Sequence, residues 1–231
     1  MPRAIAELSA FLDAYHQLSK KSAEQKRASY GQLLHELAPR YEQILAMRRG
    51  TAQRFNVFSA LGVSRKELVH SGFLAFLLDP LARHDQGDRL LRSFLRRLSI
   101  EVPVNVNLAR SSVVREYTLG QYGRLDIAVF LPNGGIVGIE NKVDAPDREG
   151  QVFGYQQALG LLCRGAVGCH ALLFLTPDGR QPRSCSAEVD VTCWSYGDLA
   201  SWLGEHDALP ERLQTVMRMY TETCLCIGEG E

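Results

Sequence analysis

The chain has 231 residues, of which 45% are hydrophobic and 23% are charged, a composition typical of a soluble globular protein and not of a disordered or collagen-like one. Its 26 basic residues balance its 26 acidic residues, so the overall charge does not indicate a polyanionic partner. The longest apolar run, residues 73–78, is far shorter than the roughly 20 residues of a membrane helix. Acidic residues also interrupt the N-terminal segment where a signal peptide would be apolar. We therefore expect a cytoplasmic protein that does not bind membranes.

The charges are unevenly distributed along the chain. Residues 1–70 carry 11 basic and 6 acidic side chains, whereas residues 151–231 carry 5 basic and 10 acidic ones. This polarity would let an anionic ligand approach from the N-terminal half, although a solvated basic helix face is the commoner explanation.

Up to about residue 60 the apolar residues recur every three or four positions, which predicts amphipathic helices. Pro39 marks a kink or the start of a new helix. Because amphipathic helices need a partner surface, residues 1–60 are predicted to be a helical extension packed on a core of residues 61–231. A helix of that core is predicted to begin with a capping box, Ser64 to Glu67, and to end at Pro80. Another, at about 86–98, carries Arg89, Arg92 and Arg96 away from its apolar side.

From about residue 112 the period changes to that of strands, which are predicted over 113–117, 125–131 and 136–143. Pro132-Asn-Gly-Gly135 joins the last two as a hairpin. A helix follows to about residue 162, then strands at 171–175 and 191–194, and helices at 196–203 and 210–226. Strands interleaved with helices on a partly antiparallel sheet predict a three-layer α/β domain.

Three charged residues lie where these strands should be apolar: Asp126, Glu140 and Lys142. If Asn133–Gly135 forms a three-residue loop, Asp126 lies opposite Lys142, and Glu140 shares their face of the sheet. The other face then carries only apolar residues, apart from Asn141, which calls for a hydrogen-bond partner. A two-residue loop would instead separate Asp126 from Glu140.

Two carboxylates beside a lysine suit the cleavage of phosphodiester bonds, because the carboxylates hold a divalent cation and the lysine stabilises charge on the phosphate. The alternative is a buried salt bridge without catalysis. The next helix presents Gln151 and Tyr155 on one face, and its N-terminus favours an anion. The sequence contains no P-loop, nucleophile elbow or H-E-x-x-H motif.

These residues occur in the order of a known family: Gly123-Arg-Leu-Asp126, then Glu140-Asn-Lys142, then Gln151-Val-Phe-Gly-Tyr155. The ordered set resembles the PD-(D/E)XK nuclease superfamily, and the Q-x-x-x-Y pattern is typical of its RecB-like branch. The segment from Phe55 to Pro80 also resembles the first segment of an uncharacterised bacterial group in that superfamily. The resemblance covers residues 55–180.

The resemblance implies a restriction-endonuclease-like core, with a central mixed sheet flanked by helices, and a nuclease that depends on Mg²⁺ (or Mn²⁺). In it, Asp126 and Glu140 bind the metal and Lys142 serves the attacking water or the phosphate. A residue of the first core helix is also expected to contribute. His70 matches a histidine found there in RecB-like members, whereas the capping box explains Glu67 without catalysis. Glu116 is a further ligand or a polar residue that closes a strand.

We therefore expect a nuclease that acts on DNA, in preference to RNA. The alternatives are a nuclease-fold module that binds nucleic acid or serves as a structural element without turnover, and a metal-dependent phosphoesterase with a small substrate. The nucleic acid is expected to contact Arg124 and the arginines at 89, 92 and 96, with Gln151 and Tyr155 next to the cleaved bond. A solvated helix face is the alternative for those three arginines.

Overall fold

The computed structural model describes residues 2–52, 54–163, 170–183, 190–206 and 208–230. It divides into two units, residues 1–55 and residues 56–231. The predicted packing of residues 1–60 on the core stays a prediction. Among the described helices, none is both long and apolar enough to cross a membrane.

The first unit is one helix, α1 (Pro2–Thr51). It continues through Pro39, so the predicted start of a new helix at that residue is wrong. Apolar side chains such as Leu18 and Leu34 are exposed in this unit. A single helix has no interior, and these side chains form no core of their own.

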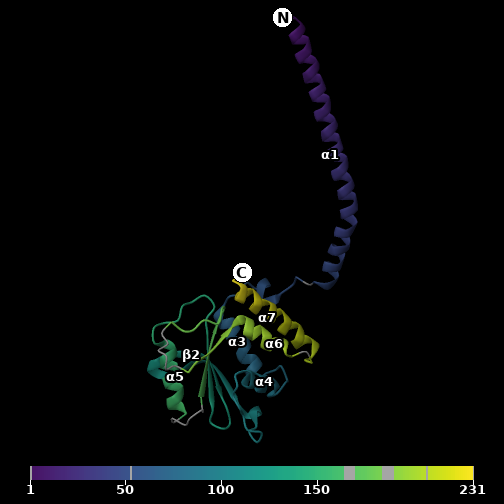
Figure 1. The fold of residues 1–231 in the computed structure, drawn as a ribbon. Coiled ribbons are helices and arrows are strands. Elements are labelled where there is room, and N and C mark those ends of the chain that lie inside the picture. Colours follow the sequence, from purple (N-terminus) through teal and green to yellow (C-terminus); the bar gives the residue numbers. More distant parts are fainter. Residues whose placement is uncertain (1, 53, 164–169, 184–189, 207, 231) are drawn as a thin grey trace. The chain divides into compact units, whose positions relative to one another are not determined.

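The second unit is built on a five-stranded sheet with the strand order β1-β2-β3-β4-β5 (Figure 1). The strands are β1 (Ser112–Thr118), β2 (Arg124–Phe130), β3 (Ile136–Asn141), β4 (His170–Thr176) and β5 (Thr192–Ser195). The first three pair antiparallel and the last three pair parallel. The predicted mixed sheet is therefore confirmed.

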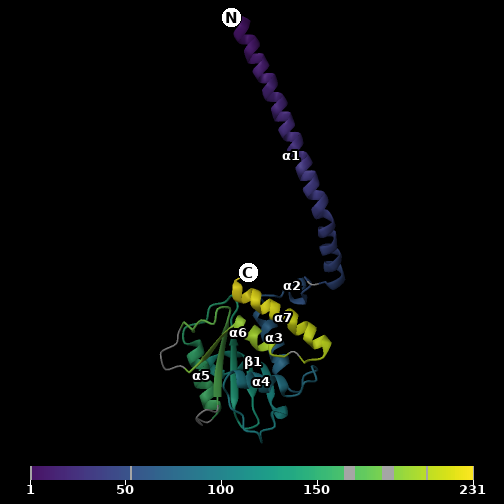
Figure 2. The same cartoon turned by 45° about the vertical axis from the view of Figure 1, so that its right-hand side comes forward.

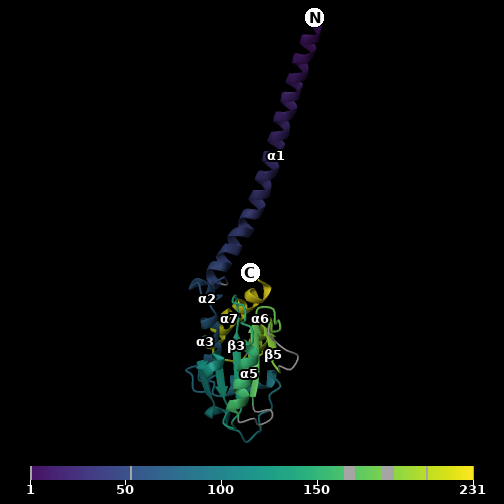
Figure 3. The ribbon, with the colours of Figure 1, turned by 90° about the vertical axis from the view of Figure 1, so that its left-hand side faces the viewer.

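Helices cover both faces of this sheet, which confirms the predicted three layers. One face carries α5 (Gln151–Leu162), and the other carries α3 (Glu67–Leu78), α4 (Arg89–Arg97), α6 (Tyr196–Gly204) and α7 (Glu211–Glu229) (Figures 1 and 3). The short α2 (Val57–Ala60) opens the unit, and α7 packs along α6 (Figure 2). Two 3₁₀ turns, Leu108–Arg110 and Gly120–Tyr122, precede β1 and β2.

Each face of the sheet buries its own apolar cluster. The face predicted to be apolar packs against α3, α4, α6 and α7. Its predicted members Ile127, Val129, Leu131, Val137, Ile139 and Val143 all belong to this cluster, together with Leu173, Leu175 and Trp194 of the parallel strands. On the other face, Ala128 and Ile136 pack with Val152 and Leu159 of α5.

The hairpin between β2 and β3 differs from its predicted register by two positions. Ile127 pairs with Ile139, and the main-chain N–H of Leu131 donates to the carbonyl of Gly135. The loop is therefore Pro132–Gly134, and the predicted loop at 133–135 is wrong. A turn of this kind ends on a residue with a left-handed backbone, and Gly134 takes φ of 87°. Because the shift is an even number, no side chain changes face.

Candidate active site

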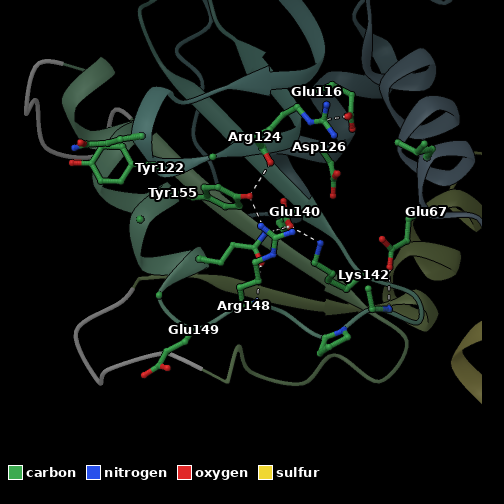
Figure 4. Close-up of a pocket in the computed structure, with 18 residues that line it drawn as sticks. Glu67, Glu116, Tyr122, Arg124, Asp126, Glu140, Lys142, Arg148, Glu149 and Tyr155 are labelled. Carbon is green, nitrogen blue, oxygen red and sulfur yellow. Dashed lines mark hydrogen bonds and ion pairs between the residues drawn. The ribbon is translucent and has the colours of Figure 1, made fainter.

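A pocket of about 700 Å³ opens where β2, β3, the start of α3 and the start of α5 meet. Five of its lining residues are acidic, namely Glu67, Glu116, Asp126, Glu140 and, on the loop before α5, Glu149. The remaining lining residues include Tyr122, Arg124, Lys142, Arg148, Gln151 and Tyr155. The structure thus brings together most of the residues that the sequence singled out (Figure 4).

The carboxylates of Asp126 and Glu140 lie on neighbouring strands. The ladder of β2 and β3 ends at the pair Ile127 and Ile139, and its continuation would set Asp126 opposite Glu140, where the predicted partner was Lys142. Asp126 is anchored because its Oδ2 accepts a 2.7 Å hydrogen bond from the main-chain N–H of Asn141. Burial is the main reason that the pKa of Asp126 is raised, and the charge of Glu116 adds to the shift.

Glu140 is almost fully buried and uses only one of its two carboxylate oxygens within the protein. Its Oε1 lies 2.7 Å from Nζ of Lys142 and accepts a 2.7 Å hydrogen bond from Nε2 of Gln151. Its Oε2 is buried and has no hydrogen-bond partner. Burial, with the nearby charge of Asp126, raises the pKa of Glu140 to about 8, although Lys142 opposes this shift. A buried oxygen left without a partner is costly, so the site favours a cationic ligand there.

Lys142 remains a cation in this setting. Burial lowers the pKa of Lys142, but the charge and hydrogen bond of Glu140 outweigh burial, and the pKa is raised overall. Figure 4 shows the side chains of Asp126, Glu140 and Lys142 directed into one space, with Glu67 on the opposite wall.

Gln151 and Tyr155 support Glu140. Both lie on the first turns of α5, four positions apart, so their side chains share one helix face. Nε2 of Gln151 also donates to the hydroxyl of Tyr155 at 2.8 Å, and that hydroxyl donates to the carbonyl of Arg124 at 2.8 Å. The two side chains therefore link the start of β2 to the carboxylate on β3.

The side chain of Asn141 faces away from the pocket and makes its hydrogen bonds to the layer formed by α3 and α6. Its Oδ1 accepts a hydrogen bond from the hydroxyl of Tyr196, and its Nδ2 donates to Oγ of Ser71. These are the partners that a polar residue on the apolar face requires. They fix the end of β3 between Glu140 and Lys142.

Glu67 does not have the capping role that was predicted for it. The predicted capping box is absent, because the N-cap is Lys66 and Glu67 is the first residue of α3. Its Oε1 instead accepts hydrogen bonds from the main-chain N–H groups of Val143, at 2.8 Å, and Ala145, at 3.3 Å. Glu67 is the acidic residue that the sequence analysis set aside. The available signal was its helical spacing from Ser71 and Leu74, which places it on the face of α3 that contacts the sheet.

His70 is buried behind the pocket and does not line it. Its Nε2 donates to the carbonyl of Ser64 at 2.8 Å, and its Nδ1 accepts from the hydroxyl of Tyr220 at 3.2 Å. Burial lowers the pKa of His70, so the ring is neutral. With both nitrogens engaged in the helical layer, His70 is not placed to serve as the metal ligand that the sequence suggested.

The arginines separate into two places. Arg124 and Arg148 line the pocket, and Arg124 pairs with Glu116 at 2.9 Å. Arg89 and Arg96 line a different cavity, of about 440 Å³, beside α4. Arg92 instead pairs with Asp88. The structure therefore does not bring the predicted ridge of α4 to the site.

The sequence comparison agrees with this geometry. A family model described as the PD-(D/E)XK nuclease superfamily matches residues 55–222. The chain belongs to the PD-(D/E)XK nuclease superfamily. The match begins just before α2 and ends within α7, so it covers the whole sheet and the pocket. Neither the curated proteins nor the solved structures contain a match to the chain.

Nucleases of this superfamily generally use divalent metals, and the side chains of the pocket determine whether such a cation can bind. In the part of the chain that the structure describes, no three acidic, histidine or cysteine side chains converge as a complete metal cage. Mg²⁺ does not require one, because it usually binds one or two carboxylates and completes its shell with water and phosphate oxygens. Asp126 and Glu140, with the unpartnered Oε2, fit this type of site.

Proposed function

We propose that this protein is a divalent-metal-dependent nuclease that hydrolyses phosphodiester bonds in the pocket between β2, β3 and α5. One observation carries the proposal: the buried Oε2 of Glu140 has no partner in the protein, and it belongs to a carboxylate that lines the same pocket as Asp126 on the neighbouring strand. Membership of the superfamily supports the same reaction.

In this proposal Asp126 and Glu140 hold Mg²⁺ or Mn²⁺. When bound, the cation supplies charge neutralisation at the phosphate and acidifies a water molecule. Glu67 lies on the facing wall of the pocket and is not one of the proposed metal ligands. Its main-chain hydrogen bonds from Val143 and Ala145 keep the end of β3 in place.

Lys142 has a different role, because an ammonium group does not bind a hard cation. Its ion pair with Glu140 holds Nζ at the edge of the carboxylate pair. From there it can orient the attacking water or stabilise negative charge that develops on the phosphate. Gln151 and Tyr155 orient Glu140. They also form the Q-x-x-x-Y pattern, on which we base the proposal that the chain belongs to the RecB-like branch.

The substrate is proposed to be nucleic acid, with DNA preferred over RNA. Besides Lys142, the pocket is lined by two further cationic side chains, Arg124 and Arg148, which can contact the phosphates of a nucleic acid. Contact with Arg89, Arg92 and Arg96 stays a prediction, and it would require a substrate that extends to α4, well beyond the pocket.

The test is a cleavage assay with the full chain. Labelled single- and double-stranded DNA and RNA are incubated with Mg²⁺, Mn²⁺ or EDTA, and products are resolved on denaturing gels. We expect cleavage of at least one substrate with metal only, and its loss in Asp126→Asn and Glu140→Gln, which keep the shape of each side chain. Tight binding without cleavage in any metal would favour the non-catalytic module, and cleavage by both variants at the parent rate would remove the site from this pocket.

A further inference from the structure

Glu116 has a left-handed backbone in the middle of an extended strand. Its φ is 52°, whereas strands have φ of about −120° to −140°. Ala52, Asp85 and Ser99, the other described non-glycine residues with positive φ, lie outside helices and strands. For a side chain with a Cβ this conformation is strained, and strain of this kind is concentrated at functional sites.

The register of β1 and β2 shows what the strained conformation achieves. Arg115 pairs with Ile127 and Tyr117 pairs with Leu125, so an uninterrupted ladder would set Glu116 directly opposite Asp126. Two carboxylates facing one another across a strand pair repel. The ladder is interrupted at this position, and the Glu116 carboxylate pairs with the guanidinium of Arg124 instead (Figure 4).

The ion pair has little value for stability alone. The side chain of Arg124 is 64% exposed, and exposed ion pairs contribute little to folding. A strained residue that gains so little stability needs another explanation. Both partners line the pocket: Glu116 lies on β1, on the side of β2 that faces away from Glu140, and Arg124 lies on β2 two residues before Asp126.

Arg124 is suited to bind phosphate. Its guanidinium can bind phosphate oxygens through two parallel hydrogen bonds, provided that its plane is held in the right orientation. The main chain of Arg124 is fixed, because its carbonyl accepts the hydrogen bond from Tyr155. The Glu116 carboxylate, 2.9 Å from Nε, then orients the exposed end of the side chain.

We propose that Glu116 is a positioning residue, which holds the Arg124 guanidinium at the mouth of the pocket to bind the phosphate next to the one that is cleaved. This inference rests on the proposed nuclease function. In the free protein the carboxylate of Glu116 also neutralises the charge of Arg124. Glu116 thus acts on the reaction only through Arg124.

The test is a double-mutant cycle on kcat and KM with the oligonucleotide that the parent cleaves best. Glu116→Gln keeps the size of the side chain and removes its charge. We expect kcat to fall at least about tenfold, with KM lowered about two- to fivefold because one negative charge leaves the mouth. If Glu116 served only to stabilise the fold, its substitution would not lower kcat and KM together.

Arg124→Ala provides the second arm of the cycle. In that background Glu116→Gln should change kcat less than about twofold, because the group that it positions is gone. A further tenfold loss would overturn the inference and show that Glu116 acts directly on the metal or the reacting groups. Parent-like kcat in Glu116→Gln alone would also overturn it, while leaving the proposed function intact.

Glu116→Gly separates strain from charge. Glycine adopts positive φ without penalty, so this variant should unfold at a higher temperature than the parent and still lose activity as Glu116→Gln does. A lower unfolding temperature would contradict the strained conformation. If the parent cleaves no nucleic acid with either metal, the proposed function fails, and this inference fails with it.

Discussion

The hydroxyl of Tyr196 donates a 2.8 Å hydrogen bond to Oδ1 of Asn141, and this bond ties α6 to the end of β3, between Glu140 and Lys142. Both side chains are almost completely buried. The geometry of the pocket on one face of the sheet therefore depends on a polar contact made on the other face.

Tyr196→Phe should lower the free energy of unfolding by about 1–3 kcal/mol, because Asn141 Oδ1 is left buried without its donor. Urea unfolding followed by circular dichroism measures the change. In a Tyr196→Phe/Asn141→Leu protein the unsatisfied oxygen is removed as well, so part of the loss should be recovered. A double variant that is as unstable as the sum of both single variants would contradict this view of the pair.

Mn²⁺ or Mg²⁺ should raise the unfolding temperature of the parent, as does any ligand that binds only the folded state. Asp126→Asn/Glu140→Gln should fold and should lose this gain, because the substituted amides remove both negative charges that hold the cation. Differential scanning fluorimetry with a metal titration gives the comparison. Ca²⁺, which also prefers oxygen ligands, tests whether the response is general for hard cations. An equal shift in parent and double variant would place the metal elsewhere.

Lys142→Met should reduce cleavage by at least about 100-fold and leave the metal-dependent rise in unfolding temperature unchanged or larger. Methionine retains most of the length of the side chain and removes the charge beside Glu140. Single-turnover cleavage and thermal unfolding are measured on the same preparation. A structural salt bridge predicts the reverse pattern, in which stability falls by about 3–5 kcal/mol while the folded fraction retains full activity.

Asp147 should make stability depend on acid pH. Its buried carboxylate lies 2.8 Å from Arg180 and accepts a hydrogen bond from the main-chain N–H of Arg183. Burial alone would raise the pKa of Asp147, but these two partners outweigh it and the pKa is lowered. The unfolded chain therefore binds this proton more readily, so the stabilisation is complete above the ordinary pKa of an aspartate and is lost as pH falls through the lowered value.

Asp147→Asn should cost on the order of 3 kcal/mol at neutral pH, since it leaves Arg180 without its buried partner. The difference from the parent should shrink as the pH is lowered below about 4. Urea midpoints measured from pH 3 to pH 7 provide the test. Asp144→Asn is a matched control, because Asp144 makes its ion pair with Arg65 on the surface. A difference that is independent of pH would contradict the assignment.

The fold and much of the site were predictable because both depend on strong periodic signals. Alternating apolar residues in β2 and β3 determined which side chains share a face, so Asp126 and Glu140 met even though the assumed loop was wrong. The choice between Asn133–Gly135 and Pro132–Gly134 depends on which glycine takes positive φ, and two adjacent glycines leave that choice open.

The errors concern residues whose role depends on tertiary contacts. Ser64 and Glu67 have the spacing of a capping box, yet Glu67 binds main-chain N–H groups from beyond β3. His70 has the residue type of a ligand, but its side chain points to Tyr220. Local pattern cannot distinguish these outcomes, because Val143, Ala145 and Tyr220 lie more than 70 positions away in the chain.

The order of the pocket residues along the chain has a consequence for folding kinetics. Arg124, Asp126, Glu140, Lys142, Gln151 and Tyr155 occupy one continuous segment formed by a hairpin and the helix that follows it. Contacts within such a segment close short loops and form early, whereas Glu67 reaches Val143 only when α3 docks across a much longer loop. The wall formed by β2, β3 and α5 should therefore be complete before α3 adds the wall that carries Glu67. For this reason, substitution of Glu67 should accelerate unfolding more than it slows folding.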